Sequence, residues 1–135
     1  MKRLLLGFLV VLGLNATAAV PQFLPVEQAF ELQPAEWKNG QLIVSWRVTP
    51  GYYLYRERLT IESATPGLKL SAPAFPKAKT MEDEIFGTVE IYDHDLVLAM
   101  PASGAGTLKV RYQGCAKAGL CYPPQTQELS VSANK

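Results

Sequence analysis

The sequence predicts an all-β domain and, within that class, a sandwich of the immunoglobulin type. Segments in which apolar and polar residues alternate recur along the chain, and turn signals such as Asn39-Gly40 and Pro50-Gly51 separate them. No stretch has the apolar spacing of an amphipathic helix of three turns. Several short strands at this spacing are typical of a sandwich or a barrel, and we expect the sandwich.

The first half of the chain supplies four of the expected strands. They cover residues 42–48, 52–55, 59–62 and 68–70. The first alternates strictly and has one strongly apolar face, while the second is aromatic and favours an extended backbone. Residues before about Pro34 are expected to form an extended arm along the sheets. Trp37 and Trp46 are interpreted as core residues.

The second half supplies the remaining expected strands. They cover residues 89–92, 95–100, 108–112 and 128–131. Asp93-His94 is interpreted as a polar turn between the first two of these strands, with His94 in solvent. Pro101, Gly104 and Gly106 are expected to form the following loop.

The N-terminus carries the features of an export signal. Lys2 and Arg3 precede an apolar stretch over residues 4–14, which is too short to span a bilayer as a helix. Small residues follow it, so we predict a cleavable signal peptide over residues 1–19, cut after Ala18 or Ala19. The mature chain, residues 20–135, then has the length of one domain.

Charge and residue types exclude two classes of function. The formal net charge is +1, so no broad electrostatic attraction to nucleic acid is expected. The chain has one histidine, His94, and two cysteines, which cannot form a closed four-ligand zinc site from nitrogen and sulfur ligands alone. No resident metal site is therefore expected.

The two cysteines, Cys115 and Cys121, lie six positions apart in an exported chain. A disulfide between them would close a loop that stabilises the fold by roughly 2–3 kcal/mol at most, so the pair suits an exposed rim better than a staple. Three interpretations remain open at this point. The pair is a working redox couple, a structural hairpin disulfide in a non-catalytic immunoglobulin-like binding module, or a carrier site for copper or another metal.

The residues around the cysteines resemble a known family. The segment Tyr112–Pro124, with its Gly-Cys-Ala-Lys-Ala-Gly-Leu-Cys-Tyr-Pro-Pro core, is similar to the signature of the N-terminal periplasmic domain of the thiol:disulfide interchange protein DsbD. Gly51–Arg56 resembles the aromatic strand of that family. Asp83–Gly87, followed by Glu90–Tyr92, resembles its cap loop, and Phe23–Phe30 has the character of its leader.

This resemblance implies an immunoglobulin-like sandwich with the redox cysteines at one end under a cap loop. The residues expected around a Cys115–Cys121 disulfide are Asp83, Glu84, Ile85, Phe86 and Gly87 of the cap loop, together with Tyr52, Tyr53, Tyr55 and Tyr122. The chain has Ile85 where the family usually has phenylalanine and Phe86 where it usually has tyrosine. Shielding of the sulfurs would therefore fall either to Phe86 or to the smaller Ile85.

The resemblance also implies a function, which needs no cofactor. The domain would act in the periplasm, as a monomer, accepting electrons from a thioredoxin-like donor domain and reducing a disulfide isomerase and the thioredoxins of cytochrome c maturation. Cys121 would form mixed disulfides with partners, and Cys115 would resolve them. Family members continue into a membrane domain and a thioredoxin-like domain, so this chain is either a piece of such a protein or a relative served by a donor in trans.

Charged and aromatic neighbours suggest how the thiols are tuned. Asp83 and Glu84, if the cap brings them close, would oppose thiolate formation, whereas Lys117 would favour it. The tyrosines at 52, 53 and 55 have two interpretations, as filling for the sandwich face and its rim or as a docking floor beside the sulfurs. Tyr122-Pro123-Pro124 is likewise either a rigid strand end or a partner contact.

Overall fold

The computed structural model describes Gly13, Asn15 and residues 22–134. Both candidate cleavage sites, and nearly all of the predicted signal peptide, lie outside the described residues. Within the described part of the chain, no helix has the length and apolar character needed to cross a lipid bilayer.

Strands dominate the described chain. In order, the elements are α1 (Val26–Ala29), β1 (Phe30–Leu32), β2 (Glu36–Lys38), β3 (Gln41–Val48), β4 (Tyr52–Tyr55), the 3₁₀ helix η1 (Arg56–Arg58), β5 (Thr60–Ser63), β6 (Leu68–Leu70), β7 (Lys79–Asp83), β8 (Gly87–Tyr92), β9 (Leu96–Gly104), β10 (Gly106–Tyr112), β11 (Gly114–Ala116) and β12 (Gln125–Val131).

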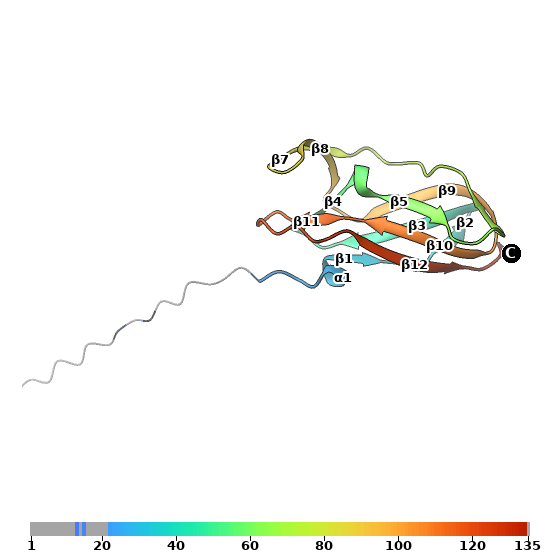
Figure 1. The fold of residues 1–135 in the computed structure, drawn as a ribbon, viewed down its shortest axis with the longest axis horizontal. Helices are drawn as coiled ribbons and strands as arrows, with labels where there is room; N and C mark the ends of the chain where they lie inside the picture. The colour runs from blue at the N-terminus through green and yellow to red at the C-terminus, as the bar shows by residue number, and fades with distance from the viewer. Residues whose placement is uncertain (1–12, 14, 16–21, 135) are drawn as a thin grey trace, which may run out of the picture.

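The strands form two layers. One layer is an antiparallel sheet in the order β1-β3-β9-β6, with β2 also paired to β3. The other combines β12-β10-β5 with β11-β4-β8-β7, because β10 leads into β11 and β4 leads through η1 into β5. Figure 1 shows β11, β4 and the β7–β8 hairpin together at one end of the molecule. The predicted all-β, immunoglobulin-like sandwich is confirmed.

The main core lies between the layers. The alternation predicted for residues 42–48 holds, since Leu42, Val44, Trp46 and Val48 are all buried on the inner face of β3. Trp46 meets Tyr112 of the opposite layer edge-to-face, with ring centroids 5.8 Å apart. This packing confirms Trp46 as a core residue.

The hairpin between β2 and β3 follows from its turn residues. Asn39 and Gly40 both have positive φ, at 51° and 77°, as a two-residue turn between twisted strands requires. The hairpin places Trp37 at the margin of the core, where the ring is half-buried and its Nε1–H donates to the Ser132 carbonyl at 2.7 Å.

The loop expected from Pro101 to Gly106 is wrong in extent. Strand β9 continues through Pro101 to Gly104, and Ala105 alone separates it from β10. The ladder between β9 and β3 ends at Pro101, whose carbonyl accepts from the Ser71 N–H at 2.9 Å as β6 becomes the partner. A proline is tolerated there because the central ladder needs no further donor from that residue.

The expected N-terminal arm is also more structured than predicted. It contains α1 and then β1, which pairs with β3 and buries Phe30 completely. The Phe30 ring meets Tyr52 and Tyr122 edge-on, with centroids 6.1 and 5.9 Å away. The leader is therefore part of the sandwich and closes the core next to the cysteines.

Candidate active site

Strand β4 is buried on both faces, so it contributes side chains both to the main core and to a second cluster around Cys115. Tyr52 and Leu54 point into the main core. Tyr53 and Tyr55 point the other way, into a second apolar cluster. That cluster, which we call the cysteine cluster, consists of Tyr53, Tyr55, Val89, Ile91 and Cys115, with Met81 packed against it.

The two cysteines are joined by a disulfide but differ in access. Cys115 lies in β11 opposite Tyr53 and is fully buried, whereas Cys121 is exposed. Their Cα atoms are 4.0 Å apart and form an isolated antiparallel bridge. An incoming thiolate can therefore reach Cys121 Sγ while Cys115 Sγ remains covered.

Gly114 makes the buried position of Cys115 possible. A Cβ atom at this residue would overlap both the ring of Phe30 and the backbone carbonyl of Tyr53. Only a residue without a side chain lets β11 approach β4 so closely. The loop that follows is tied by the Gly119 N–H, which donates to the Ala116 carbonyl at 3.0 Å.

The hydroxyl of Tyr55 connects a carboxylate to both sulfurs. It donates to Asp83 Oδ2, and its oxygen lies 3.1 Å from Cys115 Sγ and 3.9 Å from Cys121 Sγ. Burial, followed by the hydrogen bond to Asp83, raises the pKa of Tyr55 far above its usual value. Tyr55 therefore stays protonated, and the same contact lowers the pKa of Asp83, so that carboxyl stays ionised at neutral pH.

The predicted cap loop is the tip of the β7–β8 hairpin. Asp83 Oδ1 accepts from the backbone N–H groups of Ile85 and Phe86 at 2.7 and 3.0 Å, and Gly87 supplies a positive φ of 75°. An aspartate that accepts from the residues two and three positions on is a common way to fix such a turn. The tip is thus ordered by the same carboxylate that binds Tyr55.

Of the two candidate shields, Phe86 is the one in contact with the cysteine cluster. Its ring packs edge-to-face on Tyr55 with centroids 5.5 Å apart, and the Arg58 guanidinium lies 4.7 Å from the ring centroid. Ile85 is 69% exposed. Phe86 covers Tyr55, and Ile85 lies at the rim of a groove that leads to the sulfurs.

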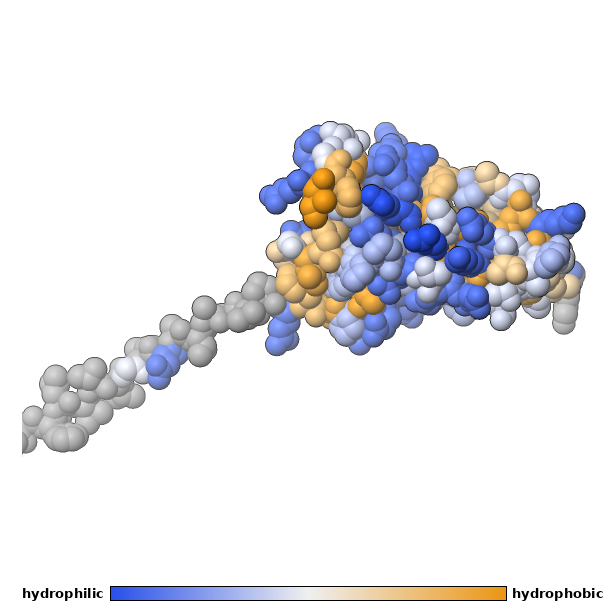
Figure 2. All heavy atoms as spheres, in the orientation of Figure 1, coloured by the Kyte–Doolittle hydropathy of each residue, from blue (hydrophilic) through white to orange (hydrophobic). Residues whose placement is uncertain are grey.

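This groove, with a volume of about 290 Å³, separates the β7–β8 hairpin, which we call the cap hairpin, from residues 116–121, which we call the cysteine loop. Its lining residues are Tyr53, Met81, Glu82, Asp83, Glu84, Ile85, Ala116, Lys117, Gly119 and Cys121. In Figure 2 apolar surface gathers at this end of the molecule, on the hairpin tip and on the end of the sandwich below it. A partner segment can thus contact Cys121 and apolar side chains together.

Tyr52 and Tyr122, which were also predicted near the sulfurs, belong to the main core. The Tyr52 hydroxyl accepts from the Leu24 N–H at 2.9 Å, and the Tyr122 hydroxyl donates to the Leu24 carbonyl. These two bonds fix the chain before α1 against the cysteine end. Neither tyrosine lines the groove.

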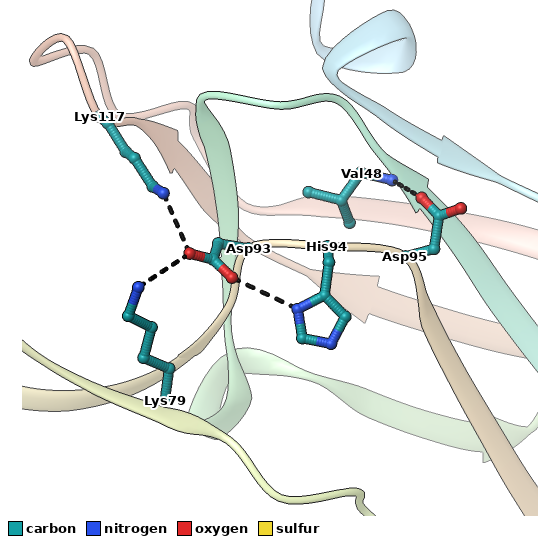
Figure 3. A network of polar contacts seen from close by, with 6 residues as sticks. All are labelled: Val48, Lys79, Asp93, His94, Asp95 and Lys117. Atoms are coloured by element: carbon teal, nitrogen blue, oxygen red, sulfur yellow. Dashed lines mark hydrogen bonds and ion pairs between the residues drawn. The ribbon is translucent and has the colours of Figure 1, made fainter.

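Lys117 lines the groove, but its ammonium is bound elsewhere. Its Nζ lies 3.0 Å from Asp93 Oδ2, and Lys79 and His94 contact the same carboxylate (Figure 3). Asp93 was predicted only as part of a polar turn, because its partners Lys79 and Lys117 lie 14 and 24 positions away and no local spacing links them. His94 is exposed, as expected of a turn residue.

Comparison with known proteins defines the class to which this fold and site belong. Residues 20–133 match the family described as "Thiol:disulfide interchange protein DsbD, N-terminal". The chain belongs to this family of thiol:disulfide interchange proteins.

Curated relatives with similar sequences are also DsbD proteins. The chain is 43% identical over 114 residues to "Thiol:disulfide interchange protein DsbD 2" of Pseudomonas aeruginosa, covering 84% of this chain and 19% of that protein. It is 42% identical over 115 residues to DsbD of Cronobacter sakazakii, covering 83% of this chain and 20% of that protein. The chain therefore spans about a fifth of the length of these relatives.

Two solved structures share the fold. The reduced DsbD N-terminal domain of Neisseria meningitidis has a TM-score of 0.72 and 34% identity, covering 83% of this chain and 91% of that one. A structure of the complex between the DsbD and PilB N-terminal domains of the same organism has a TM-score of 0.71 and 32% identity, covering 84% and 91%.

Proposed function

We propose that this domain carries electrons in the periplasm by thiol–disulfide exchange. It accepts two electrons from a thioredoxin-like donor and uses them to reduce disulfides of other periplasmic proteins. The observation that carries the proposal is the asymmetry of the pair: Cys121 is exposed at a groove, and Cys115 is buried behind it. A staple gains nothing from such an asymmetry, whereas a couple that forms mixed disulfides needs one open sulfur and one protected sulfur.

The exchange has two steps. The Cys121 thiolate attacks one sulfur of the partner disulfide, a bond forms between them, and the second partner sulfur leaves as a thiolate that takes up a proton. The Cys115 thiolate then attacks Cys121 Sγ, which closes the internal disulfide and releases the first partner sulfur. Two electrons and, at neutral pH, two protons pass to the partner. Reduction by the donor is the reverse sequence.

The proposed partners are proteins whose own active cysteines can enter the groove. The donor is a thioredoxin-like domain, and the acceptors are a periplasmic disulfide isomerase and the thioredoxins of cytochrome c maturation. Support comes from family membership and from the Neisseria complex of a DsbD N-terminal domain with a PilB N-terminal domain. The same family membership supports export through a signal peptide over residues 1–19, a single domain over residues 20–135 and action as a monomer.

The cap hairpin has a proposed role as a cover with an electrostatic brake. Phe86 shields Tyr55 and the sulfurs behind it, and the carboxylates of Asp83 and Glu84 oppose a thiolate at Cys121. A docking partner would displace the hairpin tip and remove both effects. Replacing Asp83 and Glu84 with their amides should then lower the pKa of the Cys121 thiol. An unchanged thiol pKa would show that these carboxylates do not oppose the thiolate.

A redox titration tests the proposed function against the alternative of a binding module with a structural disulfide. The protein is equilibrated in glutathione buffers of graded ratio, and free thiols are counted after acid quenching. A working couple passes between its two states within the range of periplasmic redox proteins. A structural bond stays oxidised, with a potential below about −300 mV, and that result would leave only the binding module.

A further inference from the structure

The carboxylate of Asp93 contacts two lysine ammonium groups and a histidine ring at the edge of the site. Its Oδ2 lies 3.0 Å from Lys117 Nζ and 3.3 Å from Lys79 Nζ, and its Oδ1 lies 3.3 Å from His94 Nδ1. Figure 3 shows Lys117 and Lys79 reaching it from two different segments. The Asp93 side chain is 18% exposed, whereas those of Lys117 and Lys79 are 48% and 67% exposed, so water partly screens these contacts.

Asp93 therefore joins the two walls of the groove. Lys79 opens β7, the first strand of the cap hairpin, and Lys117 belongs to the cysteine loop. The turn that carries Asp93 is itself held in place, because Asp95 Oδ1 accepts from the Val48 N–H at 2.9 Å. The backbone of Lys117 is held too, since its N–H donates to the Gly51 carbonyl at 2.8 Å. The Lys117 ammonium, at the end of a flexible side chain, can still move from one anionic partner to another.

The position of the Lys117 ammonium matters because most of the charged groups around Cys121 are acidic. The cap hairpin lines the groove with Glu82, Asp83 and Glu84, and β4 contributes Tyr53, with Tyr55 behind it. Lys117 is the one basic side chain among the described residues that line the groove. Among the described residues that line the groove, Lys117 thus supplies the one cation available to a thiolate at Cys121, and Asp93 binds it.

We propose that Asp93 is a positioning residue for thiol exchange, which binds the Lys117 ammonium and so withholds it from the Cys121 thiolate. The inference rests on the proposed function, and it assigns Asp93 a role in setting how readily reduced Cys121 ionises. Hydrogen bonds from Lys117 first, and then from His94 and Lys79, hold the pKa of Asp93 well below its usual value, so the carboxylate stays charged throughout the neutral range. Lys117 is thereby kept as an anchor between the cysteine loop and the β8–β9 turn.

The test measures the pKa of the Cys121 thiol in a Cys115→Ala background, where one thiol titrates alone. The readout is the rate of alkylation by iodoacetamide as a function of pH. Asp93→Asn should free Lys117 and lower the thiol pKa by about half a unit to one unit, as a nearby opposite charge does when partly screened. At neutral pH the thiolate fraction should rise about three- to tenfold, and 1 M salt should shrink the difference.

Two further variants separate charge from structure. Adding Lys117→Gln to Asp93→Asn should abolish the shift, because the ammonium that causes it is gone. Lys79→Gln removes another cation from Asp93 without releasing Lys117, and it should leave the thiol pKa within about 0.2 units of the parent. An unchanged thiol pKa in Asp93→Asn, or an equal fall in the double variant, would overturn the proposal.

Lys117→Gln alone tests whether Lys117 stabilises the thiolate while Asp93 is present. It changes only an exposed side chain. With Asp93 intact, the thiol pKa should stay close to the parent value. A rise of about one unit would mean that Lys117 already serves the thiolate, and the proposal would fail even if Asp93→Asn did not fold. These measurements involve no partner protein, so they can fail while the exchange function stands, and the redox titration can fail while they succeed.

Discussion

The main core and the cysteine cluster share strand β4, yet they are built differently. The main core packs aliphatic and aromatic side chains between two layers and is closed on all sides by strands and the N-terminal segment. The cysteine cluster lies on one face of the β11-β4-β8-β7 sheet beside the tip of the β7–β8 hairpin, and it opens on a groove. Two of its five buried residues are tyrosines, and the hydroxyl of one of them, Tyr55, binds a carboxylate and lies beside the Cys115 sulfur.

Strand β4 therefore contributes to the stability of the main core and, through its other face, to the surroundings of the two sulfurs. Alternate residues of β4 point to opposite faces, so Leu54 strengthens the main core while Tyr55 touches both sulfurs. The polar groups of the cysteine cluster lower its contribution to stability, since each must keep a partner in a small space. We therefore expect the sandwich to hold its shape while the cap hairpin moves.

Truncating one fully buried aliphatic residue in each cluster gives the largest expected contrast. Leu98→Ala in the main core should reduce the free energy of unfolding by about 3–4 kcal/mol, because a closed core cannot fill the cavity. Ile91→Ala in the cysteine cluster should cost less, about 2–3 kcal/mol, because the hairpin can settle into the space. Urea denaturation measures both.

The same pair should differ in native-state reduction by dithiothreitol. Below the unfolding transition, Ile91→Ala should speed reduction of the Cys115–Cys121 disulfide severalfold, and Leu98→Ala should leave it unchanged. Equal acceleration by both variants would mean that the two clusters open together and that the cap hairpin does not move independently of the sandwich.

Removing the Tyr55 hydroxyl should produce an intermediate effect. Tyr55→Phe breaks the bond to Asp83 and should cost about 1–2 kcal/mol, since hydrogen bonds to charged groups are the stronger ones. The pKa of Asp83, followed by NMR, should rise toward its usual value because its first stabilising partner is lost. Tyr92→Phe, which breaks the bond from this main-core tyrosine to the Pro76 carbonyl, is the matched control and should leave that pKa unchanged.

Replacing Asp83 should produce the smallest effect, and one that depends on pH. The folded-state pKa of Asp83 lies below its unfolded value, so its ionised form stabilises the fold above about pH 4, and this contribution is lost as pH falls through the folded pKa. Asp83→Asn should cost about 1 kcal/mol at pH 7 and less in acid. In a Tyr55→Phe background the gap should shrink, and an undiminished gap would place the stabilisation elsewhere.

Much of the main core could be predicted from the sequence, because most of its longer strands carry a local signal. Strand β3 alternates over its whole length, and Asn39-Gly40 specifies a hairpin through backbone preference alone. Strand β7 was missed for a physical reason: in Lys-Thr-Met-Glu-Asp only Met81 is apolar, so no alternation marks it. Such a strand is stabilised by its ladder to β8 rather than by its own pattern.

The cysteine cluster was predictable in its residues but not in its contacts. Cys115 and Cys121 stand out as the two cysteines of the chain, whereas their redox role and the cap loop were found through resemblance, and the residues alone could not say which sulfur is open. That depends on Gly114, which permits β11 to approach Tyr53. The bonds from Tyr55 to Asp83 and to Cys115 join residues 28 and 60 positions apart, so only the folded chain brings them together.

The most direct test of the account is to trap the mixed disulfide on each cysteine in turn. Cys115→Ala and Cys121→Ala are each incubated with an oxidised periplasmic thioredoxin-like protein and resolved by non-reducing electrophoresis. The account predicts that Cys115→Ala, which keeps the exposed sulfur, accumulates the covalent complex, and that Cys121→Ala forms little. A complex on the buried Cys115, or none on Cys121, would contradict it.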